Sequence, residues 1–146
     1  MPPVTPLLQL AVPFVWWGAV VAISFLEAPL KFHAPGITIP LGLGIGRLVF
    51  RALNAVELAL AALFLAAALI GPVPSTTGWG LYAAAAAIVV VQTAVVRPLL
   101  DRRALRIVAG ESLPRSRQHL VYIGLDVAKV VVLPALGAVL AAGILT

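Results

Sequence analysis

Four long apolar stretches alternate with short polar or proline- and glycine-rich connections along the chain. They cover about residues 7–32, 47–70, 79–99 and 119–145. Each stretch reaches the roughly 20 residues that a helix needs to cross a hydrocarbon core about 30 Å thick. The pattern predicts an all-α polytopic membrane protein in which four transmembrane helices form a single domain over residues 1–146.

The connections differ in character. Residues 33–46 contain two prolines and four glycines, and we expect them to form a loop. The third helix is predicted to continue beyond the membrane to about Ala109, because a helical apolar stripe persists there and Gly110 is a plausible stop. Residues 100–118 then form the second loop. No internal repeat stands out in the sequence.

Composition supports the bilayer as the solvent. The chain is 62% hydrophobic and only 10% charged, whereas a soluble domain carries about 25% charged residues. It contains no cysteine, which excludes disulfides, thiolate metal sites and thiol-based redox chemistry. Its first ten residues lack the basic n-region and cleavage site of a signal peptide, so we expect the first stretch to be retained.

The net charge of +5 is distributed unevenly. Basic residues flank or fill the first and third connections: Lys31, Arg47, Arg51, Arg97, Arg102, Arg103, Arg106, Arg115 and Arg117. The second connection and both tails have no charged side chain. The positive-inside rule then places the two basic loops, 33–46 and 100–118, in the cytoplasm and both termini outside a cell (inner or plasma) membrane. The expected partner of this charge is the lipid surface and not nucleic acid.

Every stretch also contains polar side chains at a depth where a lipid-exposed charge costs about 2.5–3.5 kcal/mol. These residues are Ser24, Glu27, Asn54, Glu57, Gln92, Thr93, Asp126 and Lys129. On each helix they share one face with the neighbouring basic or aromatic residues. We therefore expect the four faces to turn inward and form a polar pocket that opens toward the cytoplasm. The spacing also predicts ion pairs between Asp126 and Lys129 and between Glu27 and Lys31.

Two of these acids are candidate proton donors or acceptors, because a desolvated carboxyl can exchange protons near neutral pH. They are Glu57 and Asp126. The candidate ligand-binding residues are Glu27, Asn54, Gln92, Tyr122, Lys129, Arg97 and Trp17. No cofactor or metal site is predicted, because His33 and His119 lack a carboxylate at ligand spacing. Glycines 42, 44 and 46 do not match a dinucleotide-binding fingerprint.

Three functions fit this pattern. The first is a small transporter or channel-like protein, or a subunit of one, that moves protons or a small polar solute, and such a thin bundle suggests a homo-oligomer. The second is a membrane enzyme that uses a buried Glu or Asp as general acid on a lipidic or isoprenoid substrate. The third is an accessory subunit of a membrane complex. Polar contacts that only hold helices together are the structural alternative, and the apolar outer half argues against a continuous permeation path.

Three segments carry a resemblance to known proteins. They are EAPLKF at the end of the first stretch, VVRPLLDRR at the exit of the third, and RSRQHLVYIGLD at the entry to the fourth. With them the whole chain resembles small four-span membrane proteins of the TMEM205-like and DUF4149-like families. The resemblance implies a four-helix membrane bundle and little about activity. Asp126 and Lys129 belong to no pattern of these families, so the resemblance assigns no site residue.

Overall fold

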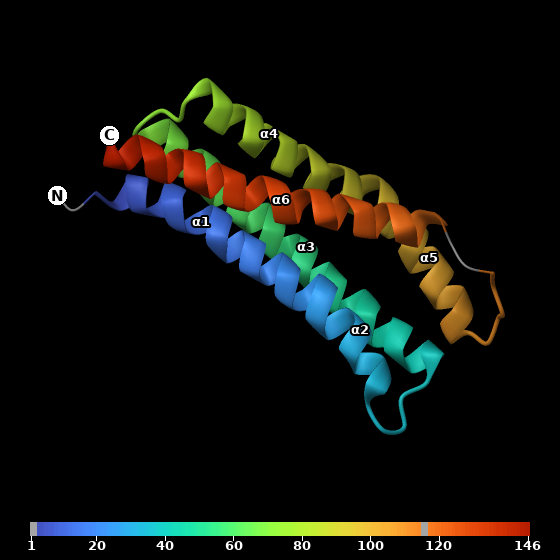
Figure 1. The fold of residues 1–146 in the computed structure, drawn as a ribbon. Coiled ribbons are helices and arrows are strands. Elements are labelled where there is room, and N and C mark those ends of the chain that lie inside the picture. The colour runs from blue at the N-terminus through green and yellow to red at the C-terminus, as the bar shows by residue number, and fades with distance from the viewer. Residues whose placement is uncertain (1–2, 115–116) are drawn as a thin grey trace.

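A computed structural model describes residues 3–114 and 117–146, and it is a bundle of long helices (Figure 1). The described residues contain four helical stretches that are long and apolar enough to cross a membrane. The first comprises α1 (Val4–Val20), η1 (Val21–Glu27), α2 (Ala28–Leu30) and η2 (Lys31–His33), and the second is α3 (Ile39–Ile70). The third comprises α4 (Thr76–Val91), η3 (Gln92–Val96) and α5 (Arg97–Val108), and the fourth is α6 (Arg117–Leu145). The predicted all-α architecture with four membrane-length helices is confirmed.

The helix boundaries differ from the prediction mainly in the first loop. Residues 33–46 were expected to be a loop, but α3 already begins at Ile39. Thr38 caps this helix by accepting a hydrogen bond from the Leu41 N–H, and Pro40 lies in the first turn, where its missing N–H costs nothing. These two residues outweigh the three glycines that follow. The predicted extension of the third helix is confirmed, since α5 ends at Val108 before Gly110, whose φ is +101°.

The start of α1 and the end of α6 lie together at one end of the bundle, which we call the terminal end (Figure 1). The connections that follow η2 and α5 lie at the opposite end, which we call the basic end because the arginine-rich segments meet there. Arg115 lies outside the described residues. Each helix packs on two neighbours, with α1 between α3 and α6, and with α5 against α3 and α4 against α6.

One apolar cluster fills the terminal half of the bundle. All four helices contribute to it through the buried side chains of Val12, Trp16, Val20, Ala61, Phe64, Ala68, Tyr82, Ala85, Val89, Leu133 and Leu136. Within the cluster, the Tyr82 hydroxyl links two helices by donating a hydrogen bond to the Ala61 C=O at 2.8 Å. This half of the bundle is therefore a packed apolar plug, as the sequence of the outer half predicts.

Two membrane-length helices contain a wide, π-helical turn directly before a proline. The Ala28 N–H donates to the Ile23 C=O, and the Arg97 N–H donates to the Gln92 C=O, five residues back instead of four. Pro29 and Pro98 follow directly. A proline supplies no N–H and its ring crowds the carbonyl four residues earlier, so the wider turn relieves this conflict.

The two halves of the chain share several features, although no internal repeat was predicted from the sequence. LVFRALN in α3 corresponds to LVYIGLD in α6, and the wide turn before Pro29 corresponds to the one before Pro98. Burial follows the same alignment. Glu57 and Lys129 are both buried, as are Phe64 and Leu136 further along the same two helices.

Equivalent positions of the two halves meet at the centre of the bundle. The Phe50 ring packs edge-on against the Tyr122 ring with centroids 5.6 Å apart, and Glu57 pairs with Lys129. Contact between equivalent residues is what two hairpins related by a twofold rotation produce. The bundle consists of two helical hairpins that run in the same direction (Figure 1), and these contacts are consistent with a parallel repeat.

Candidate functional site

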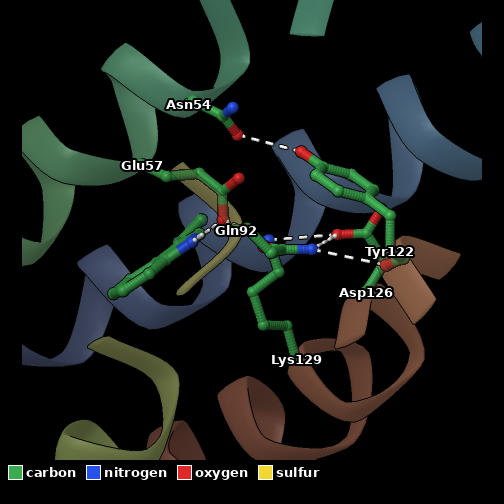
Figure 2. Close-up of polar contacts among 7 residues, drawn as sticks. Asn54, Glu57, Gln92, Tyr122, Asp126 and Lys129 are labelled. Atoms are coloured by element: carbon green, nitrogen blue, oxygen red, sulfur yellow. Dashed lines mark hydrogen bonds and ion pairs between the residues drawn. The ribbon is translucent and has the colours of Figure 1, made fainter. Parts of the chain in front are cut away.

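A buried charged network lies at the centre of the bundle (Figure 2). The Lys129 ammonium lies 2.6 Å from Glu57 Oε2 and 3.1 Å from Asp126 Oδ1. The residues Glu57 and Lys129 are 0% exposed and Asp126 is 1% exposed. Such burial is tolerated only when the charges are paired and their hydrogen-bonding groups are satisfied. The predicted pairing of Asp126 with Lys129 is confirmed.

Each carboxylate receives a second donor from another helix. The Trp16 Nε1–H of α1 donates to Glu57 Oε2 at 2.8 Å, and the Gln92 side-chain amide of η3 donates to Asp126 Oδ1 at 2.9 Å. The same amide lies 3.4 Å from the Tyr122 C=O. All four membrane-length helices thus contribute a side chain to one network. The predicted polar residues of the second, third and fourth helices converge, whereas the first helix contributes Trp16 in place of the predicted Glu27.

The network is incompletely satisfied within the described residues. Oε1 of Glu57 and Oε1 of Gln92 are buried and have no hydrogen-bond partner there. With all three charged groups ionised, two carboxylates face one ammonium, so the network carries one negative charge in excess. A buried excess charge is costly, and the free carboxylate oxygen of Glu57 is where a proton or a water molecule can bind.

A second polar link connects α3 and α6 closer to the basic end. The Tyr122 hydroxyl donates to Asn54 Oδ1 at 3.0 Å (Figure 2). The Arg97 guanidinium lies over the Tyr122 ring, 4.5 Å from its centroid, and 4.9 Å from the centroid of Phe50. These cation–π contacts hold the side chain against the bundle interior, and Arg97 also forms an ion pair with Asp101 at 3.6 Å.

A cavity of about 290 Å³ lies between α3 and the η3–α5 segment, directly beside Asn54. Its lining comprises Arg51, Asn54, Ala55, Leu58, Thr93, Arg97, Pro98 and Asp101. The prediction of one pocket that contains every polar residue is therefore wrong for this conformation. Asn54 and Arg97 line the cavity, whereas Glu57, Gln92, Tyr122, Asp126 and Lys129 are not among its lining residues. The two carboxylates around Lys129 and the Gln92 amide close on one another because pairing offsets their desolvation.

Two predicted site residues lie outside both the network and the cavity. Glu27 forms the predicted ion pair with Lys31, at 3.6 Å, and its side chain is 29% exposed near the basic end. Trp17 is 36% exposed, and its Nε1–H donates to the Val130 C=O at 3.1 Å. Trp17 is turned about 100° away from the inward face of its helix, which explains its position at the α1–α6 boundary.

Trp16 was not predicted as a site residue, whereas its neighbour Trp17 was. Trp16 is 1% exposed and binds Glu57 directly. A signal for it existed, since Val12, Trp16, Val20 and Ser24 follow one another at intervals of four and therefore share a helix face. Phe50, which packs against Tyr122 and Arg97, was missed as well.

No group of three or more His, Asp or Glu side chains that could hold a metal ion occurs in the described part of the chain. The chain matches no protein-family model, and comparisons with curated proteins and with solved structures give no match. The resemblance to TMEM205-like and DUF4149-like proteins therefore stays a prediction. The candidate site rests on its own geometry.

Proposed function

We propose that this protein is a small transporter of the cell (inner or plasma) membrane that moves protons, or a small polar solute together with protons. In this proposal the basic end faces the cytoplasm and both termini lie outside. Glu57 and Asp126 exchange the proton, and Lys129 is their shared counter-charge. The observation that carries the proposal is the contact of one fully buried lysine with two buried carboxylates. Intramembrane ionisable groups of this kind are typical of proton relays.

The charge balance of the network explains how a proton would be used. Two acids and one base can exist in two states that differ by one proton, one neutral and one with a single negative charge. A neutral network is stable when buried, whereas a negatively charged one is stabilised by water or another hydrogen-bond donor. Proton release would therefore favour a conformation in which the network becomes accessible.

The conformation described here is closed toward the terminal end by the apolar cluster around Trp16 and Phe64. Solute access is therefore proposed from the basic end, and movement of one hairpin against the other would alternate it. The wide turns before Pro29 and Pro98 are the places where the backbone hydrogen bonding is already irregular. An enzyme using Glu57 or Asp126 as general acid would need substrate at carboxyls that are fully covered here, so we give transport precedence.

Lipid and further copies of the chain are the proposed surroundings of this bundle. Large apolar side chains such as Leu7, Leu26, Leu69 and Val131 are well exposed on its outside. Exposing these apolar side chains to lipid costs no free energy, whereas exposing them to water is unfavourable. A homo-oligomer, which a thin conduit suggests, would cover part of the same surface.

The test uses proteoliposomes that contain a pH-sensitive dye and an imposed potassium diffusion potential. Wild-type protein is expected to carry protons faster than protein-free liposomes, and both Glu57→Gln and Asp126→Asn are expected to reduce the flux to that background. Each substitution keeps a hydrogen-bond acceptor for Lys129 but removes the titratable proton. Initial rates of internal pH change give the measurement.

Glu111→Gln serves as the matched control. Glu111 lies near the basic end, half-exposed and paired with Arg106 outside the network, so this variant should keep the wild-type rate. Wild-type rates in both network variants would return Glu57 and Asp126 to a structural role. A wild-type flux no greater than that of empty liposomes would contradict proton transport itself.

A further inference from the structure

Four residues that line the cavity each have a buried polar atom with no hydrogen-bond partner within the described residues. These atoms are Nδ2 of Asn54, Oγ1 of Thr93, Nε of Arg97 and Oδ1 of Asp101. Buried polar groups in folded proteins are nearly always hydrogen-bonded, to protein, water or ligand. Three of these four atoms belong to groups that can donate a hydrogen bond, so the cavity has a surplus of donors.

The orientation of the Asn54 amide is fixed by its neighbour. The Tyr122 hydroxyl donates a hydrogen bond to Asn54 Oδ1 at 3.0 Å, and the Nδ2 group of the same amide has no hydrogen-bond partner within the described residues. Asn54 is only 4% exposed and lines the cavity. The amide therefore leaves an oriented N–H group without a hydrogen-bond partner next to a space of about 290 Å³ whose lining includes Asn54.

The charge of the lining is positive. The lining contains two arginines, Arg51 and Arg97, and one carboxylate, that of Asp101, which pairs with Arg97. The Arg97 guanidinium is held in place by the Tyr122 and Phe50 rings. Its Nη1 atom lies 3.6 Å from Asp101 Oδ1, and its Nε–H has no hydrogen-bond partner within the described residues. A fixed guanidinium next to oriented neutral donors is the arrangement that recognises phosphate or carboxylate oxygens.

We propose that this cavity is a binding site for a small oxyanion, a phosphate or carboxylate group, held by Arg97, Asn54 and Thr93. Arg51 adds attraction from the exposed rim. The group can belong to a free anion that enters from the basic end. It can also belong to the headgroup of an anionic phospholipid, because Leu58, 41% exposed, borders the cavity on the lipid-facing side of α3.

The inference names the class of solute for the proposed transporter, and it rests on that proposed function only for the fate of the bound anion. Binding itself requires neither proton exchange nor transport. A binding experiment in detergent can therefore fail while proton flux in liposomes succeeds, and the reverse holds as well.

The first experiment is calorimetric titration of the full chain in a maltoside detergent with inorganic phosphate. Saturable binding is expected, and Arg97→Gln should weaken it by roughly tenfold or more, since a charge-assisted hydrogen bond is lost. Arg102→Gln is the matched control. Arg102 is exposed on the same helix, lies outside the cavity, and its replacement changes the net charge equally. Equal weakening by both variants would show general attraction to a basic surface and would overturn the site.

A second variant tests the site without changing Arg97, whose replacement could disturb the local fold. Asn54→Asp retains an oxygen acceptor for the Tyr122 hydroxyl but replaces the Nδ2 donor with a second oxygen. It should weaken phosphate binding by roughly tenfold or more, while helicity by circular dichroism stays at the wild-type level. Unchanged affinity in a folded Asn54→Asp protein would contradict the proposed role of this amide and with it the site.

The lipid source is tested with phosphatidylglycerol, and uncharged diacylglycerol serves as the comparison. Native mass spectrometry should show phosphatidylglycerol retained by the wild type and by Arg102→Gln but lost from Arg97→Gln and Asn54→Asp if the headgroup is the ligand. Selective binding of phosphate alone would identify a free anion instead. The proposal fails if neither probe binds, or if both cavity variants bind each probe like the wild type.

Discussion

Lys129→Met is expected to destabilise the bundle by about 3–5 kcal/mol, the range measured when one partner of a buried ion pair is removed. Methionine fills most of the space of the lysine side chain, so packing changes little. The loss arises because Glu57 and Asp126 then lie buried next to each other without the ammonium that contacts both. The free energy of unfolding in mixed micelles titrated with a denaturing detergent gives the measurement.

A double mutant separates this electrostatic cost from lost packing. Glu57→Gln together with Lys129→Met removes one negative charge and the lysine, and it should lose less stability than the two single changes added together. Strict additivity would mean that Glu57 and Lys129 do not interact appreciably, despite the 2.6 Å between Oε2 and Nζ. That result would remove the basis for treating the network as one unit.

Trp16→Phe is expected to have the second largest effect, a loss of about 1.5–3 kcal/mol for the hydrogen bond to a charged acceptor. The indole N–H donates to Glu57 Oε2 from a side chain that is almost fully covered. Phenylalanine keeps an aromatic ring in the apolar cluster but has no donor. The same micelle titration measures the loss, and proton flux in liposomes should fall with it.

Trp17→Phe is the natural comparison, because the next residue makes the same chemical change on another face. Trp17 donates only to a backbone carbonyl near the surface of α1 and is 36% exposed. Its replacement should cost well under half as much as that of Trp16. Similar losses at both positions would show that burial of the indole N–H at Glu57 contributes little.

Much of the fold could be predicted from the sequence because membrane-length apolar runs leave few alternatives. The start of α3 could not, because the three glycines before Arg47 suggested a loop. Thr38 and Pro40 nevertheless suffice to begin a helix there, in a setting where neighbouring helices can satisfy glycine-rich backbone. Which residues lie in the membrane, and on which side the termini lie, stays a prediction.

The candidate site was predictable to the level of helix faces. Helical spacing identified Glu57, Gln92, Asp126 and Lys129, and these residues do meet. Helical spacing does not reveal which polar groups pair with each other and which lie beside an open space. That division depends on side-chain reach, and it put Glu57 in a closed network but Arg97 at the cavity.

The similarity of the two halves was hidden by the chemistry of the substitutions. Asn54 corresponds to Asp126 and Phe50 to Tyr122, so the paired side chains have similar shapes but are different residue types. Glu57 and Lys129 even reverse the charge. A search for identical residues therefore finds little, whereas burial and contact at the centre of the bundle make the correspondence plain.

The opposite charges of Glu57 and Lys129 have a consequence for self-recognition. Two copies of the first hairpin, joined in the same way, would bring glutamate against glutamate, and two copies of the second would bring lysine against lysine. Either pairing buries like charges and is strongly disfavoured. Only a first hairpin and a second hairpin satisfy each other, whether they come from one chain or are exchanged between two neighbouring chains in the membrane.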